Sequence, residues 1–229
     1  MNILKNSAVL FFALVVSSFT FAQEKSVEDT YLQQNVEIMI VREQANSLNR
    51  DDKMLALEYV RQMLENGNAG DEVRSVLTGL ATDGTLNKVR DEGRTANNYP
   101  DVRLKAVSYM GQIKTKESAN SLVKVILIEP NPEVVSEAIH SLEKIGINEG
   151  DEIVNAISFV FTRFDARQPD NVLALAVIDA LDAFTRNTGS KNSEIYKILG
   201  SISNNSHYAT PVRNYAAKKL AGIYKVANK

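Results

Sequence analysis

The chain has 229 residues, of which 44% are hydrophobic and 24% charged, and its formal net charge is −2. This composition is that of an ordinary globular protein with one or two packed cores, and eleven glycines and five prolines are too few for a loop-rich or all-β fold. Because cysteine is absent, a disulfide framework, a thiolate zinc site and a cysteine nucleophile are excluded.

The first residues have the pattern of an export signal. A positive charge at Lys5 precedes the apolar run 8–16, and a small-x-small exit ends at Ala22. This pattern predicts a cleavable secretory signal over 1–22, cleaved after Ala22 to leave a mature chain without membrane insertion. The alternative is an uncleaved membrane anchor, although hydroxyl residues interrupt the run before the roughly 20 apolar residues that a spanning helix needs. An exported chain without cysteine fits a bacterial periplasm or exterior, so the expected location is periplasmic or secreted.

Residues 23–98 are expected to form an N-terminal helical cap followed by a polar insertion. Helical periodicity predicts helices over 28–49, 51–67 and 71–84, and no convincing strand pattern appears. Asp71 is the expected N-cap of the third helix. The first helix should bury one apolar stripe, which comprises Leu32, Val36, Met39 and Ile40. The polar segment 85–98 follows.

Residues 99–229 contain four similar sequence patterns, each at the start of an expected helix. Each start places an alanine between branched apolar residues, and Asn131 and Thr210 should cap the helices that begin at Pro132 and Pro211. The four aligned sets are Val102, Ala106, Val107, Met110 and Ile113; Val134, Ala138, Ile139, Leu142 and Ile145; Val172, Ala176, Val177, Ala180 and Ala183; and Val212, Ala216, Ala217, Leu220 and Ile223. The small alanine lets a paired helix approach closely.

A second helix follows each of the first three starts, at 116–129, 151–164 and 192–203. The helices 151–164 and 171–184 are apolar nearly all round, which predicts packing on several sides. The last helix is richly charged, as the solvent-facing end of a stacked array should be.

The segment PDVRLKAVSYMG (100–111), with its phased alanines, resembles the first-helix signature of bacterial HEAT-repeat proteins, in the branch related to phycobilin-lyase-like repeats. The resemblance covers about residues 99–229. It implies an all-α fold, an α-α superhelix (a HEAT/armadillo-like solenoid) with a divergent N-terminal cap. It also implies a ladder of acids and arginines, but here the arginine position reads Arg103, Val135, Leu173 and Arg213, so hydrophobic stacking must hold the middle repeats.

No catalytic, cofactor-binding or metal-ligating residue is predicted. The two histidines, His140 on a helix and His207 in a loop, have no partner at the spacing of a metal site. The acidic pairs at 51–52, 71–72 and 151–152 all stand at helix starts, where the helix dipole stabilises them. Lyase relatives within the repeat class keep an enzyme as an alternative.

Three surfaces are candidates for binding a protein partner, whose identity the sequence leaves open. The broad curved surface of the array, lined mainly by the second helix of each pair, offers Lys116, Asn120, Lys124, Asn155, Arg163 and Lys197. The insertion offers Arg90 and Arg94, although a solvated connector is the alternative. The C-terminal end offers Arg213, Lys218 and Lys219 with Tyr208, Tyr215 and Tyr224, within a stretch of seven basic residues and one acidic residue over 191–229.

The expected function is therefore a non-catalytic, exported protein-binding or scaffolding module of the bacterial envelope. An export signal disfavours nucleic acid as the partner of the basic end. The alternatives are an enzyme of the lyase-like type and a membrane-tethered adaptor that keeps its N-terminus.

Overall fold

The computed structural model describes residues 27–227, and the side chains of residues 36–224. The predicted signal at 1–22 lies outside the described residues. The chain divides into two compact units, 1–37 and 38–229, and the described part of the first unit is the beginning of helix α2.

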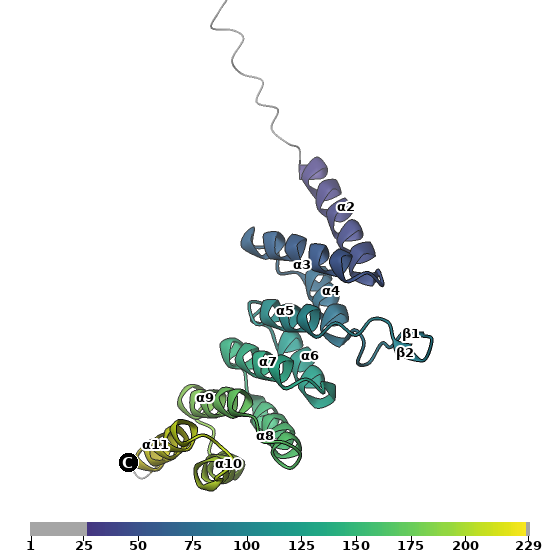
Figure 1. Cartoon of the computed structure of the whole chain (residues 1–229). Helices are drawn as coiled ribbons and strands as arrows, with labels where there is room; N and C mark the ends of the chain where they lie inside the picture. The colour runs from purple at the N-terminus through teal and green to yellow at the C-terminus, as the bar shows by residue number, and fades with distance from the viewer. Residues whose placement is uncertain (1–26, 228–229) are drawn as a thin grey trace, which may run out of the picture. The chain divides into compact units, whose positions relative to one another are not determined.

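The described residues are almost entirely helical, which confirms the all-α prediction (Figure 1). The prediction of no strand is corrected by a two-stranded antiparallel hairpin of two residues on each side. None of the described helices is both long and apolar enough to cross a bilayer. The elements are α2 (Val27–Asn46), α3 (Arg50–Glu65), α4 (Asp71–Thr82), β1 (Arg90–Asp91), β2 (Arg94–Thr95), α5 (Pro100–Met110), α6 (Lys116–Ile128), α7 (Pro132–Ile145), η2 (Glu149–Asp151), α8 (Glu152–Asp165), α9 (Asn171–Thr188), α10 (Ser193–Asn204) and α11 (Thr210–Ala227).

Within residues 38–229 the helices pack in two layers. In the first layer, α3, α5, α7, α9 and α11 each contact the next; in the second layer, α4, α6, α8 and α10 do the same (Figure 1). The two layers bury one continuous apolar cluster that extends from Ile38 to Ile223. Each helix buries a face toward the other layer and toward its neighbours, so the outer faces of both layers remain available to solvent.

The aligned apolar sets lie mostly in this core. All five positions of the set that begins at Val102, and all five of the set that begins at Val134, are buried. The prediction of burial is wrong for Val172 and Ala217, because Val172 is 60% exposed and Ala217 is also exposed. In α9 the buried residue is Leu173, which lies about 100° further round the helix than Val172.

Two helices of the first layer approach closely where α5 ends against α7. A Cβ on Gly111 would lie 2.8 Å from the Cβ of Ser141, and the Ser141 hydroxyl donates to the Val107 carbonyl at 2.8 Å. Only glycine leaves room for this approach, so the apolar-glycine end of the sequence pattern has a packing reason.

The predicted helix caps are confirmed in one of three cases. The Asn131 side chain accepts from the amides of Glu133 and Val134, as expected for an N-cap. The N-cap prediction for Asp71 is wrong, because Gly70 occupies the N-cap position and Asp71 lies in the first turn. The prediction for Thr210 is also wrong, because Thr210 is the first residue of α11 and its hydroxyl accepts from the Arg213 side chain instead of from a backbone amide.

The stripe predicted for the first helix is wrong. Met39 and Ile40 are 66% and 47% exposed, and Val36 is exposed as well, whereas Ile38 and Val41 are buried. The buried residues repeat at three-residue spacing, and the phase is set by which side of α2 faces the core. Leu32 lies outside the residues whose side chains are described.

The position that holds arginine in the repeat pattern is occupied by a charged residue in the first and last repeats and by apolar residues in the middle repeats. Arg103 and Glu129 are 1% and 0% exposed and form a two-point ion pair between α5 and the end of α6, with Nε–Oε2 at 2.7 Å and Nη2–Oε1 at 3.2 Å. The equivalent Val135 and Leu173 are buried among apolar side chains. The middle helix pairs therefore rely on hydrophobic packing at this position, as the sequence predicted.

Candidate functional site

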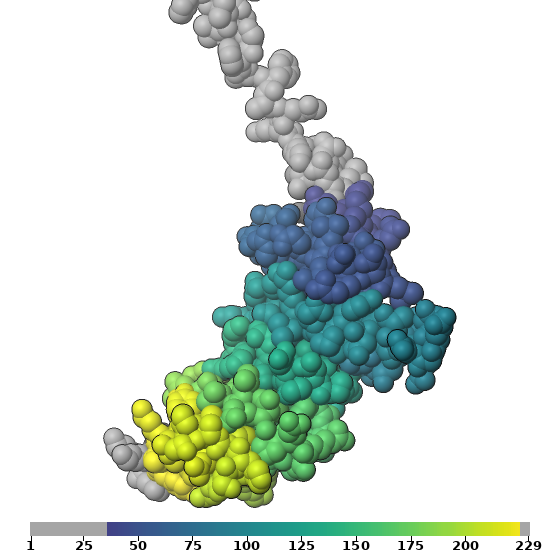
Figure 2. All heavy atoms as spheres, viewed as in Figure 1, coloured from purple at the N-terminus to yellow at the C-terminus, as the bar shows by residue number. Residues whose placement is uncertain are grey.

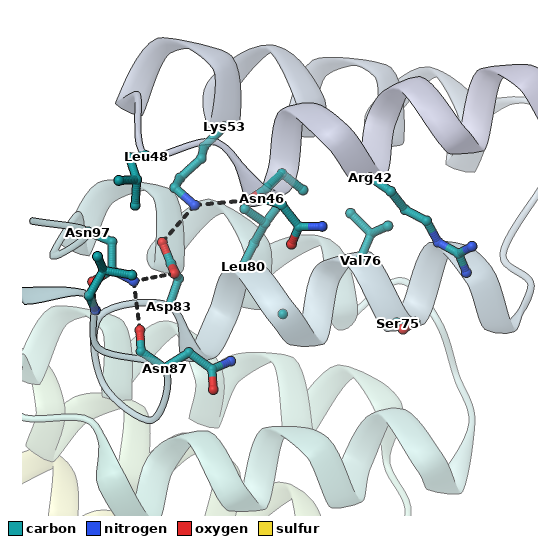
Figure 3. Close-up of a pocket in the computed structure, with 13 residues that line it drawn as sticks. Arg42, Asn46, Leu48, Lys53, Ser75, Val76, Leu80, Asp83, Asn87 and Asn97 are labelled. Atoms are coloured by element: carbon teal, nitrogen blue, oxygen red, sulfur yellow. Dashed lines mark hydrogen bonds and ion pairs between the residues drawn. The ribbon is translucent and has the colours of Figure 1, made fainter.

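A groove of about 500 Å³ lies between the C-terminal part of α2, helix α4 and the segment after α4 (Figure 3). Its α4 side is lined by small residues, because Ser75 and Gly79 lie one turn apart there, and a Cβ on Gly79 would meet open space. The lining comprises Arg42, Ala45, Asn46, Leu48, Lys53, Ser75, Val76, Gly79, Leu80, Asp83, Asn87, Val89 and Asn97.

A buried polar network closes one end of the groove (Figure 3). Lys53, only 2% exposed, places its Nζ 2.9 Å from Asp83 Oδ2 and donates to the Ala45 carbonyl at 2.9 Å. Asn97 Nδ2 donates to Asp83 Oδ1 and to the Asn87 carbonyl, each at 2.6 Å. Because the ammonium and the carboxylate neutralise each other, this pair provides neither a free base nor a free acid for catalysis.

Sequence reasoning missed Lys53. The sequence indicates its burial by its position in the helical repeat. Lys53 lies three and four residues before the buried Ala56 and Leu57, on the face of α3 that packs into the core. A lysine at such a position needs a buried carboxylate partner, and Asp83 is that partner.

The insertion 85–98 is an anchored segment that carries the β1–β2 hairpin, not an irregular connector. Asn97 is 1% exposed, and its Oδ1 accepts from the Val89 amide at 2.9 Å. Gly84 has φ +72° and a Cβ there would lie 2.4 Å from the Asn97 carbonyl, so this turn requires glycine. Arg90 and Arg94 are exposed on the hairpin, which projects from the body of residues 38–229 (Figure 2).

The second layer brings five of the six predicted contact residues to its outer face. Lys116, Asn120, Lys124, Asn155 and Lys197 are exposed on α6, α8 and α10, which follow one another in this layer. Lys116 pairs with Glu149 and Lys197 with Glu194, while Asn155 accepts a hydrogen bond from Asn192 at 2.7 Å. The hydrogen bond to Glu149 raises the pKa of Lys116. We call these five residues and Phe159 the second-layer face.

Arg163 differs from the other five, because its guanidinium is used inside the fold. It donates to the carbonyls of Ile126 at 3.0 Å, Glu129 at 3.1 Å and Leu127, at the end of α6. These carbonyls have no partner within their own helix, so Arg163 caps α6 from the neighbouring hairpin. Burial, followed by the nearby charge of Arg167, lowers the pKa of Arg163.

Phe159 is the residue of this face that sequence reasoning missed. The apolar circumference of 151–164 predicted that it would be packed, but the side chain is 62% exposed one turn after Asn155. Buried Ile157 and Val160 on either side of it belong to the core, and Phe159 points away from them. An exposed aromatic among polar side chains is the composition of a binding hot spot.

The C-terminal basic-aromatic set is dispersed by the fold. Tyr208 is 3% exposed and its hydroxyl donates to Asp165 Oδ1 at 2.6 Å, an environment that raises its pKa by burial and by this hydrogen bond. Tyr215 donates to Asp179 and Lys219 pairs with Asp182, both on α9. Arg213 is half-buried against Thr210, and Tyr224 is exposed. Of the three predicted cations, Lys218 alone is fully exposed, so the set forms no continuous surface.

Residues with acid–base or metal chemistry do not gather in the described part of the chain. No group of three or more histidine, aspartate or glutamate side chains there could hold a metal ion. His140 is half-buried with its Nδ1 3.6 Å from Glu143, and His207 is exposed beside Asn205. The three acidic pairs stand at or before the first turns of α3, α4 and α8, as predicted.

A scan against protein-family models finds no match for the chain, and neither the search of curated proteins nor the search of solved structures finds a significant match.

Proposed function

We propose that the chain is an exported, non-catalytic protein-binding or scaffolding module built as a HEAT-like solenoid. The solenoid proposal is supported by the two helix layers of residues 38–229 and by buried alanines at the aligned positions Ala106, Ala138, Ala176 and Ala216. Arrays of stacked helix pairs expose one long surface, and binding at such surfaces is their usual role.

The observation that carries the proposal is the second-layer face. Three successive helices present exposed amides and ammonium groups around an aromatic ring that the core leaves out. Amide and ammonium groups beside an exposed aromatic suit a protein surface, because the ring is available for burial and the partner can satisfy the polar groups. Export through a signal at 1–22 is part of the same proposal and would place the partner in the envelope or outside the cell.

Site-specific photocrosslinking in the producing cell tests this function. A benzoylphenylalanine at Asn155 should yield a defined protein adduct, whereas the same residue at Glu133, exposed on α7 in the first layer, should yield none. An Asn155 position that gives no adduct, or the same adducts as Glu133, would overturn the proposal. Mass spectrometry of the purified protein checks export: a Gln23 terminus supports it, and an intact Met1 supports the tethered adaptor.

A second candidate function rests on the groove. Its volume of about 500 Å³ is within the range of small-molecule sites, so the enzyme or a small-ligand function would have to act there. Gly79→Gln would fill the groove, since its Cβ meets nothing within 4 Å. If this variant abolished a cellular function that Asn155 and Phe159 variants leave intact, the groove would be the functional site.

A further inference from the structure

We infer that the C-terminal ends of α6 and α8 form a docking site for an acidic polypeptide segment that carries an aromatic or aliphatic side chain. We call this site the basic-apolar patch, and it consists of Lys124, Leu127, Phe159, Arg163 and Arg167. The inference rests on the proposed function and names the chemistry of the partner.

The hydrogen bonds of Arg163 set the geometry of the patch. Because its guanidinium reaches the carbonyls of Ile126, Leu127 and Glu129, the last turns of α6 and α8 lie side by side. Phe159 is one turn before Arg163 on the same face of α8, and Lys124 is one turn before the end of α6. The two helices therefore bring an exposed ring and an ammonium group to the same part of the layer.

The apolar part of the patch consists of Phe159, 62% exposed, and Leu127, 37% exposed. The packed helix ends hold both residues on rigid elements, so they need little ordering when a partner binds. A side chain of the partner that covers the ring would remove apolar surface from water, which favours an aromatic or aliphatic residue there.

The charges of the patch are positive toward solvent. Lys124 and Arg167 are both exposed, and neither takes part in any of the ion pairs among the described residues. Three carboxylates lie close in the chain or in space, and each is hydrogen-bonded to a group outside the patch. Glu129 is buried against Arg103, Asp165 accepts from Tyr208, and Asp170 accepts from the Leu173 amide as the cap of α9. An acidic segment would supply the missing negative charge.

The charge of Arg163 is close to that of Arg167. Burial and this neighbour lower the pKa of Arg163, and the nearby carboxylate of Glu129 opposes that shift. A carboxylate that binds beside them would relieve the repulsion between the two guanidinium groups. Charge complementarity of this kind is screened by salt, so the binding should weaken as ionic strength rises.

A selection from a random 12-residue peptide library on the intact protein tests the inference. We expect the enriched peptides to carry net negative charge around at least one aromatic or aliphatic residue. Fluorescence polarisation of the best labelled peptide should show a loss of about tenfold or more for Phe159→Ser, and of similar size for Lys124→Glu combined with Arg167→Glu. Raising NaCl from 50 to 300 mM should weaken binding.

Matched controls change the same chemistry elsewhere. Val172→Ser removes an apolar side chain of similar exposure, 60%, in the first layer, and Lys191→Glu combined with Lys218→Glu reverses two exposed charges near the C-terminus. Neither should alter peptide binding by more than about twofold.

Three results would overturn the inference: enriched peptides that are neutral or basic, binding that the patch variants leave unchanged, or equal patch-dependent binding of phosphatidylglycerol vesicles or double-stranded DNA, which would indicate a general polyanion surface. A protein adduct from Asn155 with any of these results would leave the proposed function in place and reject the acidic partner. Loss of both the adduct and the peptide binding would reject both.

Discussion

Replacement of Arg103 alone by valine should destabilise the protein, because it leaves the partner carboxylate buried without a charge partner. Arg103 and Glu129 are 1% and 0% exposed, so Arg103→Val leaves a carboxylate buried with its ion-pair partner gone. Removal of one partner from a buried pair costs about 3–5 kcal/mol. Because a domain has about 5–15 kcal/mol of stability in total, the variant should be folded but severely weakened.

The double variant Arg103→Val with Glu129→Leu removes both charges. Its cost should be no greater than that of either single variant, because apolar residues at the equivalent positions Val135 and Leu173 show that this register accepts them. Some loss remains, since the Asn131 amide gives up its bond to Glu129 at 2.9 Å and Asn98 gives up its bond to Arg103 at 2.9 Å. A lost hydrogen bond of this kind is worth about 1 kcal/mol.

Urea unfolding followed by circular dichroism measures the four stabilities of this cycle, and thermal unfolding provides a second readout. A loss of 3–5 kcal/mol corresponds to roughly 6–20 °C in Tm for a protein of this size. Lys116→Val, which breaks an exposed pair with Glu149, is the control and should change stability much less. The reasoning is refuted if Arg103→Val costs less than about 1 kcal/mol or if the two single effects simply add in the double variant.

Three further predictions follow from single positions. Tyr208 has a raised pKa in the fold, so its contribution to stability is complete below about pH 10 and is lost as pH rises further, because the unfolded chain ionises first. This group alone should lower stability by about 1.4 kcal/mol per pH unit there. Tyr208→Phe should therefore reduce the slope of stability against pH in urea melts at pH 9 to 11, while Tyr109, Tyr215, Lys116 and Lys219, whose pKa values are also raised, keep the rest of it. Gly84→Ala should destabilise by about 1–3 kcal/mol, because φ is +72° and the new Cβ would meet the Asn97 carbonyl at 2.4 Å; an unchanged Tm would contradict this. Phe159→Ser should stay within about 0.5 kcal/mol of the parent, because the ring is 62% exposed, and a large loss in the same melts would show that the ring is part of the core.

The positions of the helices could be predicted because their signals are local. Asn131 before Pro132 starts α7, and Gly146, with φ +73°, ends it. The hydrogen bonds of a helix join residues four apart, so start and stop residues act within the same short segment that they delimit. The same holds for the layer pattern, since the aligned alanines recur at the equivalent turn of successive helices.

The outward-facing residues could be predicted only in part. Lys124 and Asn155 are exposed as expected, but Phe159 was expected inside and Tyr208 outside. Hydropathy ranks the cost of exposing a side chain, yet the adjacent helices decide whether anything covers it. A helix with excess apolar residues, such as α8, has more of them than its neighbours can bury.

The order of the helices and the phase of the repeated alanines were determined by the amino-acid sequence alone, because they depend on contacts within one or two turns. The roles of Lys53, Arg103, Arg163 and Tyr208 were decided by the tertiary structure. Their partners lie 26 to 43 residues away for Arg103, Arg163 and Tyr208, and no local pattern specifies such a distance. A charged side chain can be buried only where another group neutralises it or satisfies its hydrogen bonds. When that group is distant in the sequence, the packing of the layers brings the two together.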